Sequence, residues 1–175
     1  MATYKIDADH SDVMFKVKHL MISTATGYFK KFDATLTIDE EDLSNAQVVF
    51  EADIDSIDSK NEQRDAHLKS DDFFNAEQFP KMTFKSTSIE SEGSNEYTLT
   101  GDLTIRDVTK SVKLKVEYNG KTVDPWGLER MGFEISGKIN RKEYGLKWSA
   151  VTEAGGIVVA DEVKLAMNVE MIKQA

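Results

Sequence analysis

Cysteine is absent from this chain of 175 residues. Its absence excludes a disulfide framework, thiolate chemistry and any metal site built on cysteine. No apolar run approaches the roughly 18 residues that a membrane-spanning helix needs. The N-terminus also lacks a basic segment followed by an apolar one, so the sequence predicts no secretory leader. As written, the chain is expected to be cytoplasmic, and it is expected to be periplasmic if a leader has been removed.

Positive charge is scarce as well. The chain has 22 Lys and Arg residues against 31 Asp and Glu residues, a formal net charge of -9. Nucleic acids and anionic membranes attract basic surfaces, so we expect no nucleic-acid partner and no stable membrane insertion. The length suits one domain, and we expect residues 1–175 to form a single domain. The sequence leaves a homodimer open as an assembly.

What the chain does contain is long alternation of apolar and polar residues, which is typical of strands with one buried face. The predicted inward positions are Val13, Phe15, Val17, Tyr28, Phe32, Ala34, Leu36, Ile38, Val48, Phe50, Ala52, Ile54, Met82, Phe84, Tyr97, Leu99, Leu103, Ile105, Val112, Leu114, Val116, Tyr118, Met131, Phe133, Ile135, Ile139, Val163, Leu165, Met167, Val169 and Met171. Phe29 breaks the pattern within an otherwise continuous run over residues 25–39.

Short connectors separate these runs. Turns are predicted at 91–95, at 106–110 and at Asn119-Gly120, and longer links at 39–45, 122–129 and 150–156. Short hairpins make consecutive strands antiparallel neighbours. About eight long strands, with a short one near Tyr4, match the closure number of an up-and-down barrel. We therefore predict an all-β fold, an eight-stranded antiparallel β-barrel.

Residues 54–84 interrupt the alternation once. Ser59-Lys60-Asn61-Glu62 reads as a capping box, which predicts a helix from there to about Leu68. A second start signal at Ser70-Asp71-Asp72 precedes Phe73 and Phe74. A short polar helix followed by aromatic residues is stable only when docked, so we expect this insertion to cap one end of the barrel.

The three histidines are the candidates for chemistry. His10, His19 and His67 lack the spacing of a metal motif. Asp9-His10-Ser11 has the residue types of a catalytic triad, but neighbours in sequence point apart. All three histidines could simply be partly buried and hydrogen-bonded. His19 shares the parity of Phe15 and Val17, so it could instead be a polar group inside the barrel that contacts a ligand.

Arg64, Asp65 and His67 form a dense ionic group on one helical turn. They could recognise a polar head group at the barrel mouth, or they could form an ion-pair network that holds the helix to the rim. We favour the second interpretation.

Five segments, 6–20, 26–36, 54–84, 99–114 and 132–146, resemble the YceI-like family of lipid- and polyisoprenoid-binding proteins and occur in the same order. The most specific is 54–84, with Arg64, His67-Leu68, Phe73-Phe74, Pro80 and Phe84 in register. The resemblance implies an extended, lipocalin-like barrel whose interior holds a polyisoprenoid, an isoprenoid quinone or a fatty amide. It implies no catalytic residue, metal or cofactor other than such a bound lipid. Many members carry a secretory leader, which this chain does not show.

The leading hypothesis is non-enzymatic carriage or storage of such a long-chain lipid. An alternative is a hydrolase or other enzyme that acts on the lipid with His10, His19 or His67 as acid or base, which requires two histidines to converge near a carboxylate. A third is a filled barrel that serves as an interaction module. The predicted ligand-binding residues are Phe15, Val17, His19, Phe32, Leu36, Phe50, Arg64, His67, Phe84, Leu99, Leu103, Leu114, Phe133, Ile135 and Leu165.

Overall fold

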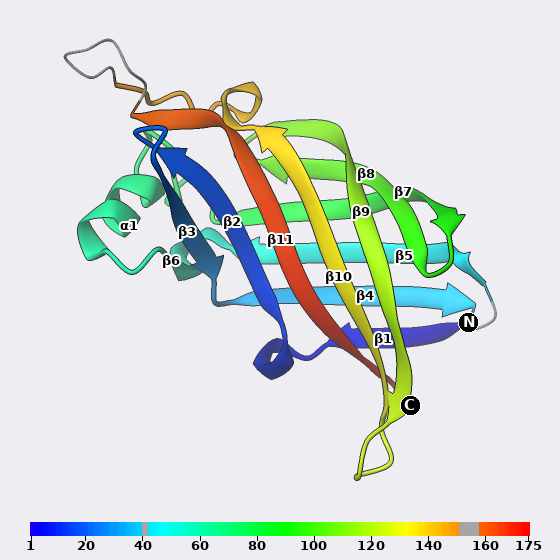
Figure 1. The fold of residues 1–175 in the computed structure, drawn as a ribbon. Helices are drawn as coiled ribbons and strands as arrows, with labels where there is room; N and C mark the ends of the chain where they lie inside the picture. Colours follow the sequence, from blue (N-terminus) through cyan, green and yellow to red (C-terminus); the bar gives the residue numbers. More distant parts are fainter. Residues whose placement is uncertain (40–41, 151–157) are drawn as a thin grey trace.

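The computed structural model describes residues 1–39, 42–150 and 158–175, which are almost entirely β-structure (Figure 1). The strands are β1 (Ala2–Ile6), β2 (Asp12–His19), β3 (Ser23–Phe29), β4 (Phe32–Asp39), β5 (Asp42–Asp53), β6 (Ile57–Asp58), β7 (Lys81–Gly93), β8 (Glu96–Ile105), β9 (Val108–Val123), β10 (Glu129–Asn140) and β11 (Val159–Lys173). The helices are α1 (Glu62–Lys69) and the single-turn η1 (Ala8–His10), η2 (Ile54–Ser56) and η3 (Arg141–Tyr144). None of the described helices is long and apolar enough to cross a membrane.

Eight strands close into a ring. They follow the order β1-β4-β5-β7-β8-β9-β10-β11, and β11 pairs back to β1. Every pairing is antiparallel, as the short connectors predict. The predicted fold, an eight-stranded lipocalin-like barrel with one helical insertion, is confirmed.

β11 has two partners along its length. Its final residues pair with β1, whereas the part from Val159 to Asn168 pairs with β2. β2 then pairs with β3, and β3 with the two-residue β6. The β2–β3 hairpin therefore widens the wall at the end of the barrel where α1 lies (Figure 1).

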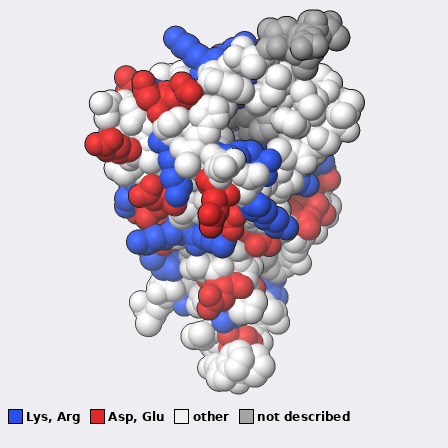
Figure 2. All heavy atoms as spheres, turned by 90° about the vertical axis from the view of Figure 1, so that its left-hand side faces the viewer, with Lys and Arg blue, Asp and Glu red and all other residues white. Residues whose placement is uncertain are grey.

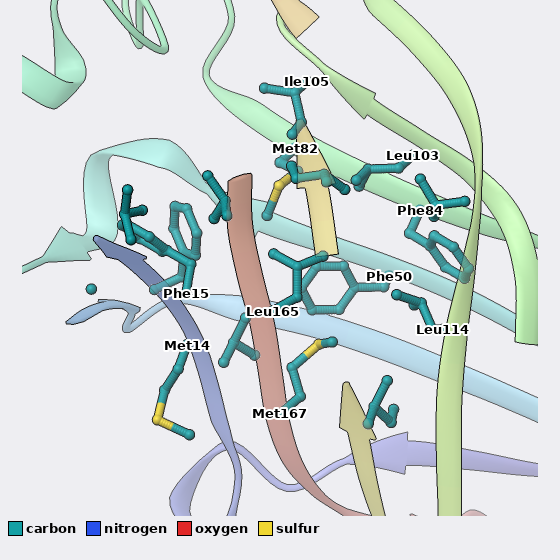
Figure 3. Close-up of a pocket in the computed structure, with 18 of the residues that line it drawn as sticks. Met14, Phe15, Phe50, Met82, Phe84, Leu103, Ile105, Leu114, Leu165 and Met167 are labelled. Atoms are coloured by element: carbon teal, nitrogen blue, oxygen red, sulfur yellow. The ribbon is translucent and has the colours of Figure 1, made fainter. Parts of the chain in front are cut away.

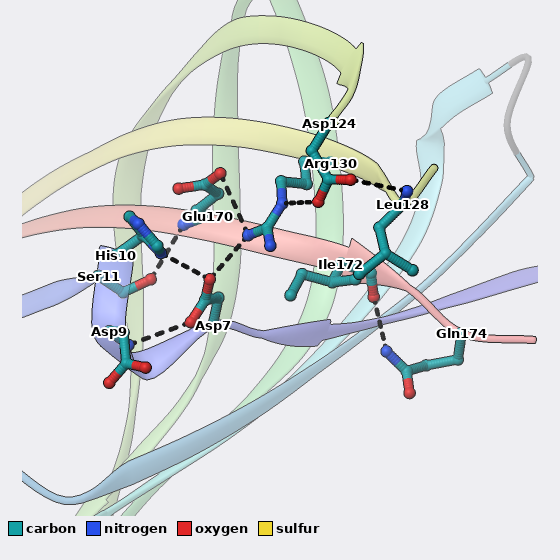
Figure 4. A network of polar contacts seen from close by, with 10 residues as sticks. All are labelled: Asp7, Asp9, His10, Ser11, Asp124, Leu128, Arg130, Glu170, Ile172 and Gln174. Atoms are coloured by element: carbon teal, nitrogen blue, oxygen red, sulfur yellow. Dashed lines mark hydrogen bonds and ion pairs between the residues drawn. The ribbon is translucent and has the colours of Figure 1, made fainter. Parts of the chain in front are cut away.

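The closing strand β1 is fastened by a polar network on the outer wall (Figure 4). Arg130 on β10 donates through Nη1 to Asp7 Oδ2 at 2.7 Å and through Nε to Asp124 Oδ2 at 2.8 Å, and Nη1 lies 3.4 Å from Glu170 Oε1. The backbone N–H of Asp7 donates to the carbonyl of Glu170 on β11 at 2.8 Å. One guanidinium thus joins the end of β1 to β10, β11 and the β9–β10 turn.

Two sequence predictions fail where the chain leaves regular pairing. The predicted continuous run over 25–39 is split at Lys30 and Lys31, so β3 and β4 are separate strands. The split changes the parity, so Phe29 is buried in the core and Tyr28 takes the opposite face. The prediction that Tyr28 faces inward is therefore wrong.

Asn119-Gly120 does not form a turn. It lies inside β9, opposite Gly132 and Phe133, where the register shifts by a bulge. The hairpin turn comes instead within the predicted longer link, where Asp124 Oδ1 accepts the backbone N–H groups of Trp126 and Leu128, each at 2.9 Å. Of the other longer links, 40–41 and 151–156 lie outside the described residues, and β5 already begins at Asp42.

The helix begins later than predicted. Its N-cap is Asn61, whose side chain accepts the backbone N–H of Arg64 at 2.9 Å, so the capping box at Ser59 is wrong. Lys60 has a left-handed backbone, with φ of 65°, which displaces Ser59 from the capping position. Ser70 caps the C-terminus of α1, and its hydroxyl donates to the carbonyl of His67, so the second predicted start is the end of the first helix.

We predict that Gly101→Ala destabilises the barrel by about 1–3 kcal/mol. A Cβ at this position on β8 would lie 2.6 Å from the carbonyl oxygen of Lys85 on β7 and would also clash with the Phe84 ring. Urea unfolding measures the loss. Gly132→Ala is the matched control, because its Cβ would meet only Asn119 Cβ at 3.7 Å. Equal effects of the two substitutions would contradict the prediction.

Arg130→Met is expected to move acid unfolding to higher pH. Burial alone would raise the pKa of Asp7, but hydrogen bonds from Arg130 and His10 outweigh it and hold that pKa below 3.8. The hydrogen bond from Arg130 likewise lowers the pKa of Asp124. Both carboxylates therefore stabilise the fold above their unfolded pKa, and this contribution is lost as pH falls through the folded values.

The measurement is an acid titration followed by circular dichroism. The free energy of unfolding that Arg130→Met removes should be largest near neutral pH and should shrink below about pH 4. Lys138→Met removes an exposed ion pair with Glu162 and serves as the control, with little expected change. Identical acid midpoints for wild type and Arg130→Met would refute the assigned role.

Candidate ligand-binding cavity

The inward faces of the strands leave a cavity of about 570 Å³. Its walls are apolar side chains from strands on all sides of the ring, including Phe50, Phe84, Leu114, Leu165 and Met167 (Figure 3). An eight-stranded barrel can be filled by its side chains or can hold a ligand. This barrel is hollow, which contradicts the filled-barrel hypothesis.

Nearly all the predicted binding residues line this cavity, the strand residues through alternation and Arg64 and His67 from α1. Those that line it are Phe15, Val17, His19, Leu36, Phe50, Arg64, His67, Phe84, Leu99, Leu103, Leu114, Phe133, Ile135 and Leu165. Phe32 does not line it and instead packs, partly buried, against the core. Phe32 is the first residue of β4, just after the bend at Lys30 and Lys31. The aromatic residue that lines the cavity beside this bend is Phe29, the last residue of β3.

Polar lining residues gather at the end covered by α1. At this end they include Lys18, His19, Ser59, Asn61, Gln63, Arg64, His67 and Arg141. Among the described residues, no Asp or Glu lines the cavity, although the chain carries a net charge of -9. Figure 2 shows this end of the molecule, where a recess lies among uncharged residues with charged side chains of both signs around it. The mouth is therefore rich in hydrogen-bond donors.

Arg64 and Asp65 hold the start of α1 to the segment before it. Asp65 Oδ1 accepts the backbone N–H of Ser59 at 2.9 Å and the Ser59 hydroxyl at 2.5 Å. Arg64 Nε donates to the same hydroxyl at 2.8 Å, and its Nη2 donates to the Ser59 carbonyl. The favoured role, holding the helix, fits these contacts. The partner of Arg64 and Asp65, however, is a serine within the insertion. Of the three residues only His67 contacts a described carboxylate, Asp72, so the expected ion-pair network with the rim is not seen among the described residues.

His67 lies at the junction between α1 and the aromatic residues that follow it. Its ring meets Phe73 and Trp148 edge to face, with centroids 5.0 and 4.9 Å apart. Its Nε2 lies 2.9 Å from Asp72 Oδ2. Phe73 and Phe74 are both buried, and Phe74 meets Phe29 of the barrel wall edge to face at 6.0 Å. The insertion is thus docked on the barrel end, as expected.

Two arginines that the sequence pattern did not single out complete the docking. Arg106, in the β8–β9 turn, donates to the carbonyls of Asp71 and Phe73 at 2.9 and 2.7 Å. Arg141 is buried and donates to the carbonyls of Leu146 and Trp148 at 2.6 and 2.7 Å. Arg106 also forms an ion pair with the Asp71 carboxylate at 2.9 Å. The main-chain carbonyl groups that accept from both arginines are present at every residue, so the sequence carries no signal for these contacts.

The histidines do not assemble into a catalytic group. His10 lies beside β1, with Nδ1 at 2.8 Å from Asp7 Oδ2, and this hydrogen bond raises the pKa of His10. His67 has a different carboxylate, Asp72, and His19 is exposed at the end of β2. The convergence that the enzyme hypothesis requires is therefore missing among the described hydrogen bonds.

Asp7, His10 and Glu170 bring their ligand atoms within 4.8 Å of one another, a spacing that could suit a metal ion. The group lies outside the barrel, because Glu170 alternates with Val169 and Met171, which line the cavity. The Arg130 guanidinium already contacts both carboxylates (Figure 4). A cation would have to compete with that charge, so we assign the group to closing the barrel.

Comparison with known proteins agrees with this geometry. The family described as "YceI-like domain" matches residues 4–171. A UPF0312 protein of Staphylococcus epidermidis is 40% identical over 171 residues, which cover 97% of each chain. Protein YceI of Salmonella newport is 41% identical over 175 residues, which cover 99% of this chain and 88% of the relative.

Solved structures share the fold. BcnA of Burkholderia cenocepacia superposes with a TM-score of 0.83 at 25% identity, over 94% of this chain and 98% of that one. The YceI protein of Campylobacter jejuni gives 0.78 at 32% identity, over 90% of each chain. A polyisoprenoid-binding domain from Saccharophagus degradans gives 0.69 over 98% of each chain, and its 13% identity shows a common fold alone. With a hollow barrel, a docked insertion and a family match across residues 4–171, this chain belongs to the YceI-like family.

Proposed function

We propose that this protein binds a long-chain amphiphilic lipid, such as a polyisoprenoid, an isoprenoid quinone or a fatty amide, as a non-enzymatic carrier or store. The observation that carries the proposal is the cavity of about 570 Å³ with its apolar wall. The name of the Saccharophagus domain, which shares the fold, supports the same class of ligand. The tail would lie among the inward side chains and the head group at the mouth under α1.

Energetics favour a long tail. Burial contributes about 0.8 kcal/mol per methylene, so a tail of roughly 15 carbons gains about 12 kcal/mol. Immobilising the tail and losing free tumbling cost several kcal/mol. The remainder corresponds to tight but reversible binding, which suits a protein that must release what it holds.

The mouth favours a head group that accepts hydrogen bonds. Lys18, Asn61, Gln63 and Arg64 line this end of the cavity and can all donate, and none of the described lining residues is a carboxylate. An amide, a quinone or a phosphate would each satisfy these donors. Of the residues predicted to contact a head group, His19 is the most available, because His67 is already bonded to Asp72 and Arg64 to Ser59.

Binding is better supported than catalysis. An acid–base mechanism needs titratable groups that converge on one reacting atom. Here His10 and His67 contact separate carboxylates, and His67 packs between two aromatic rings. Such packing fixes the imidazole as a structural element of the cap.

Chain length should dominate affinity. We expect the dissociation constant of saturated fatty amides to fall about fourfold for each added methylene until the cavity is full, and then to level off, because each methylene contributes about 0.8 kcal/mol. Isothermal titration calorimetry on delipidated protein measures the series. If none of the series is taken up, and organic extraction followed by mass spectrometry of the purified protein finds no lipid, that result would falsify the proposed function.

Leu165→Trp should weaken binding of the best amide by more than tenfold. Leu165 lies on β11 and faces the cavity, so the larger side chain would occupy space that two or more methylenes of the tail need. Lys164→Trp is the matched control, because it adds the same side chain to the outer face of the same strand. Equal affinities of the two variants would argue against a tail in this part of the barrel.

A further inference from the structure

The tip of the β2–β3 hairpin exposes three consecutive apolar residues. Leu20, Met21 and Ile22 have 39%, 59% and 84% of their surface exposed. The tip is a tight turn, in which the backbone N–H of Ile22 donates to the carbonyl of His19 at 3.2 Å. Single exposed apolar residues are ordinary, but a contiguous apolar tip points to a binding surface.

The turn geometry makes this choice of residues more unusual. Leu20 and Met21 both have left-handed backbones, with φ of 53° and 59°. A β-turn in which both central residues have positive φ strongly prefers Asn and Gly, because other side chains are strained there. The chain therefore keeps two large apolar residues where folding alone would favour small or polar ones. A role outside folding accounts for them.

The same hairpin is positively charged in an acidic protein. From the start of β2 at Asp12 to the start of β4 at Phe32, the chain contains four lysines, Lys16, Lys18, Lys30 and Lys31, and a single acidic residue, Asp12. Lys30 and Lys31 form ion pairs with Asp58 and Asp53 at the base of the hairpin. Lys16 and Lys18 are exposed nearer the tip, and within the described part of the chain neither forms an ion pair. Their charge is available to a partner with phosphate groups.

The tip lies at the mouth of the cavity. Lys18 and His19 line the cavity, and the backbone N–H of Leu20 donates to the carbonyl of Val158, which also lines it, at 2.8 Å. In Figure 1 the β2–β3 turn stands at the end of the barrel that carries α1. A surface that accepts the tip would therefore face the opening.

We propose that this tip docks the mouth of the barrel onto a phospholipid surface. Leu20, Met21 and Ile22 enter the interface between head groups and acyl chains, and Lys16 and Lys18 contact phosphates. The net charge of -9 opposes lasting attachment to an anionic membrane, so docking is reversible. A lipid could then move between bilayer and cavity without crossing open water.

The opposite end of the barrel offers a natural comparison. Val123 and Trp126 in and beside the β9–β10 turn are also exposed, at 63% and 80%. Lys121 and Arg130 flank this turn but are paired with Glu129 and Asp124, so no excess of positive charge is left for phosphates. Like the β2–β3 tip, this turn exposes apolar residues. It differs in lacking an excess of positive charge and in lying away from the cavity mouth.

The test is flotation with vesicles of phosphatidylcholine and phosphatidylglycerol, with no cavity ligand added. The variant Leu20→Asn/Met21→Gly/Ile22→Ser should bind vesicles at least about tenfold more weakly, because three apolar side chains no longer enter the interface. Its midpoint of thermal unfolding should rise or hold, since Asn-Gly suits the turn. The control Val123→Ser/Trp126→Ser should bind as wild type does.

A second variant tests the charges. Lys16→Gln/Lys18→Gln should lose about fivefold in affinity per lysine for vesicles that contain phosphatidylglycerol, and little for pure phosphatidylcholine. Equal flotation of wild type and the tip variant would overturn the proposal. The proposal would also be overturned if the wild type did not bind vesicles but formed a dimer, and the tip variant were monomeric. Docking needs no lipid in the cavity, so its failure is distinct from failure of the proposed function.

Discussion

The hollow interior depends on closure of the ring by β1, a strand of five residues. Its backbone pairs with β4 on one side and with the end of β11 on the other. Without it the wall would have two open edges, and an open sheet must bury its apolar face by collapsing onto itself. Closure satisfies the main-chain hydrogen bonds around the ring, so the inward side chains need not fill the centre. Tyr4, fully buried at this seam, donates to Glu129 at 2.6 Å, and Arg130 secures the chain just beyond it.

Alternation was enough to predict the ring because a strand with one buried face fixes the parity of every residue, as in β9 and β11. Alternation failed where a bend or a bulge in the main chain shifts which residues of a strand face inward. Because of the bend at Lys30 and Lys31, Phe29 faces the core instead of the predicted Tyr28. Asn119-Gly120 was a misleading turn signal, because a bulge uses the same permissive backbone, here with φ of 116° at Gly120. Only the pairing partner across the sheet decides between the two outcomes.

The mouth was harder to predict than the wall. Apolar lining residues follow from the parity of each strand. The capping insertion could be predicted because its polar, helix-forming residues interrupt the alternation. The arginines that hold the insertion to the barrel, in contrast, follow no periodic pattern in the sequence. Arg106 and Arg141 act on carbonyl groups that are far from them in sequence or belong to irregular segments. The polar character of the mouth therefore arises largely from tertiary folding, and sequence reasoning identified only His19 on β2 and the residues on α1.

The cap has a further consequence for how the barrel opens. None of the residues of α1 is buried, and the helix is held by hydrogen bonds to Ser59 and by the aromatic residues that follow it. Its contacts are few compared with the continuous ladders of the ring, so the helix can separate in a sub-global opening whose free energy is well below that of global unfolding. Under the proposed function, such an opening would let the barrel exchange its ligand on the timescale of a local fluctuation, so the stability of the fold and the residence time of the ligand would be set independently of each other.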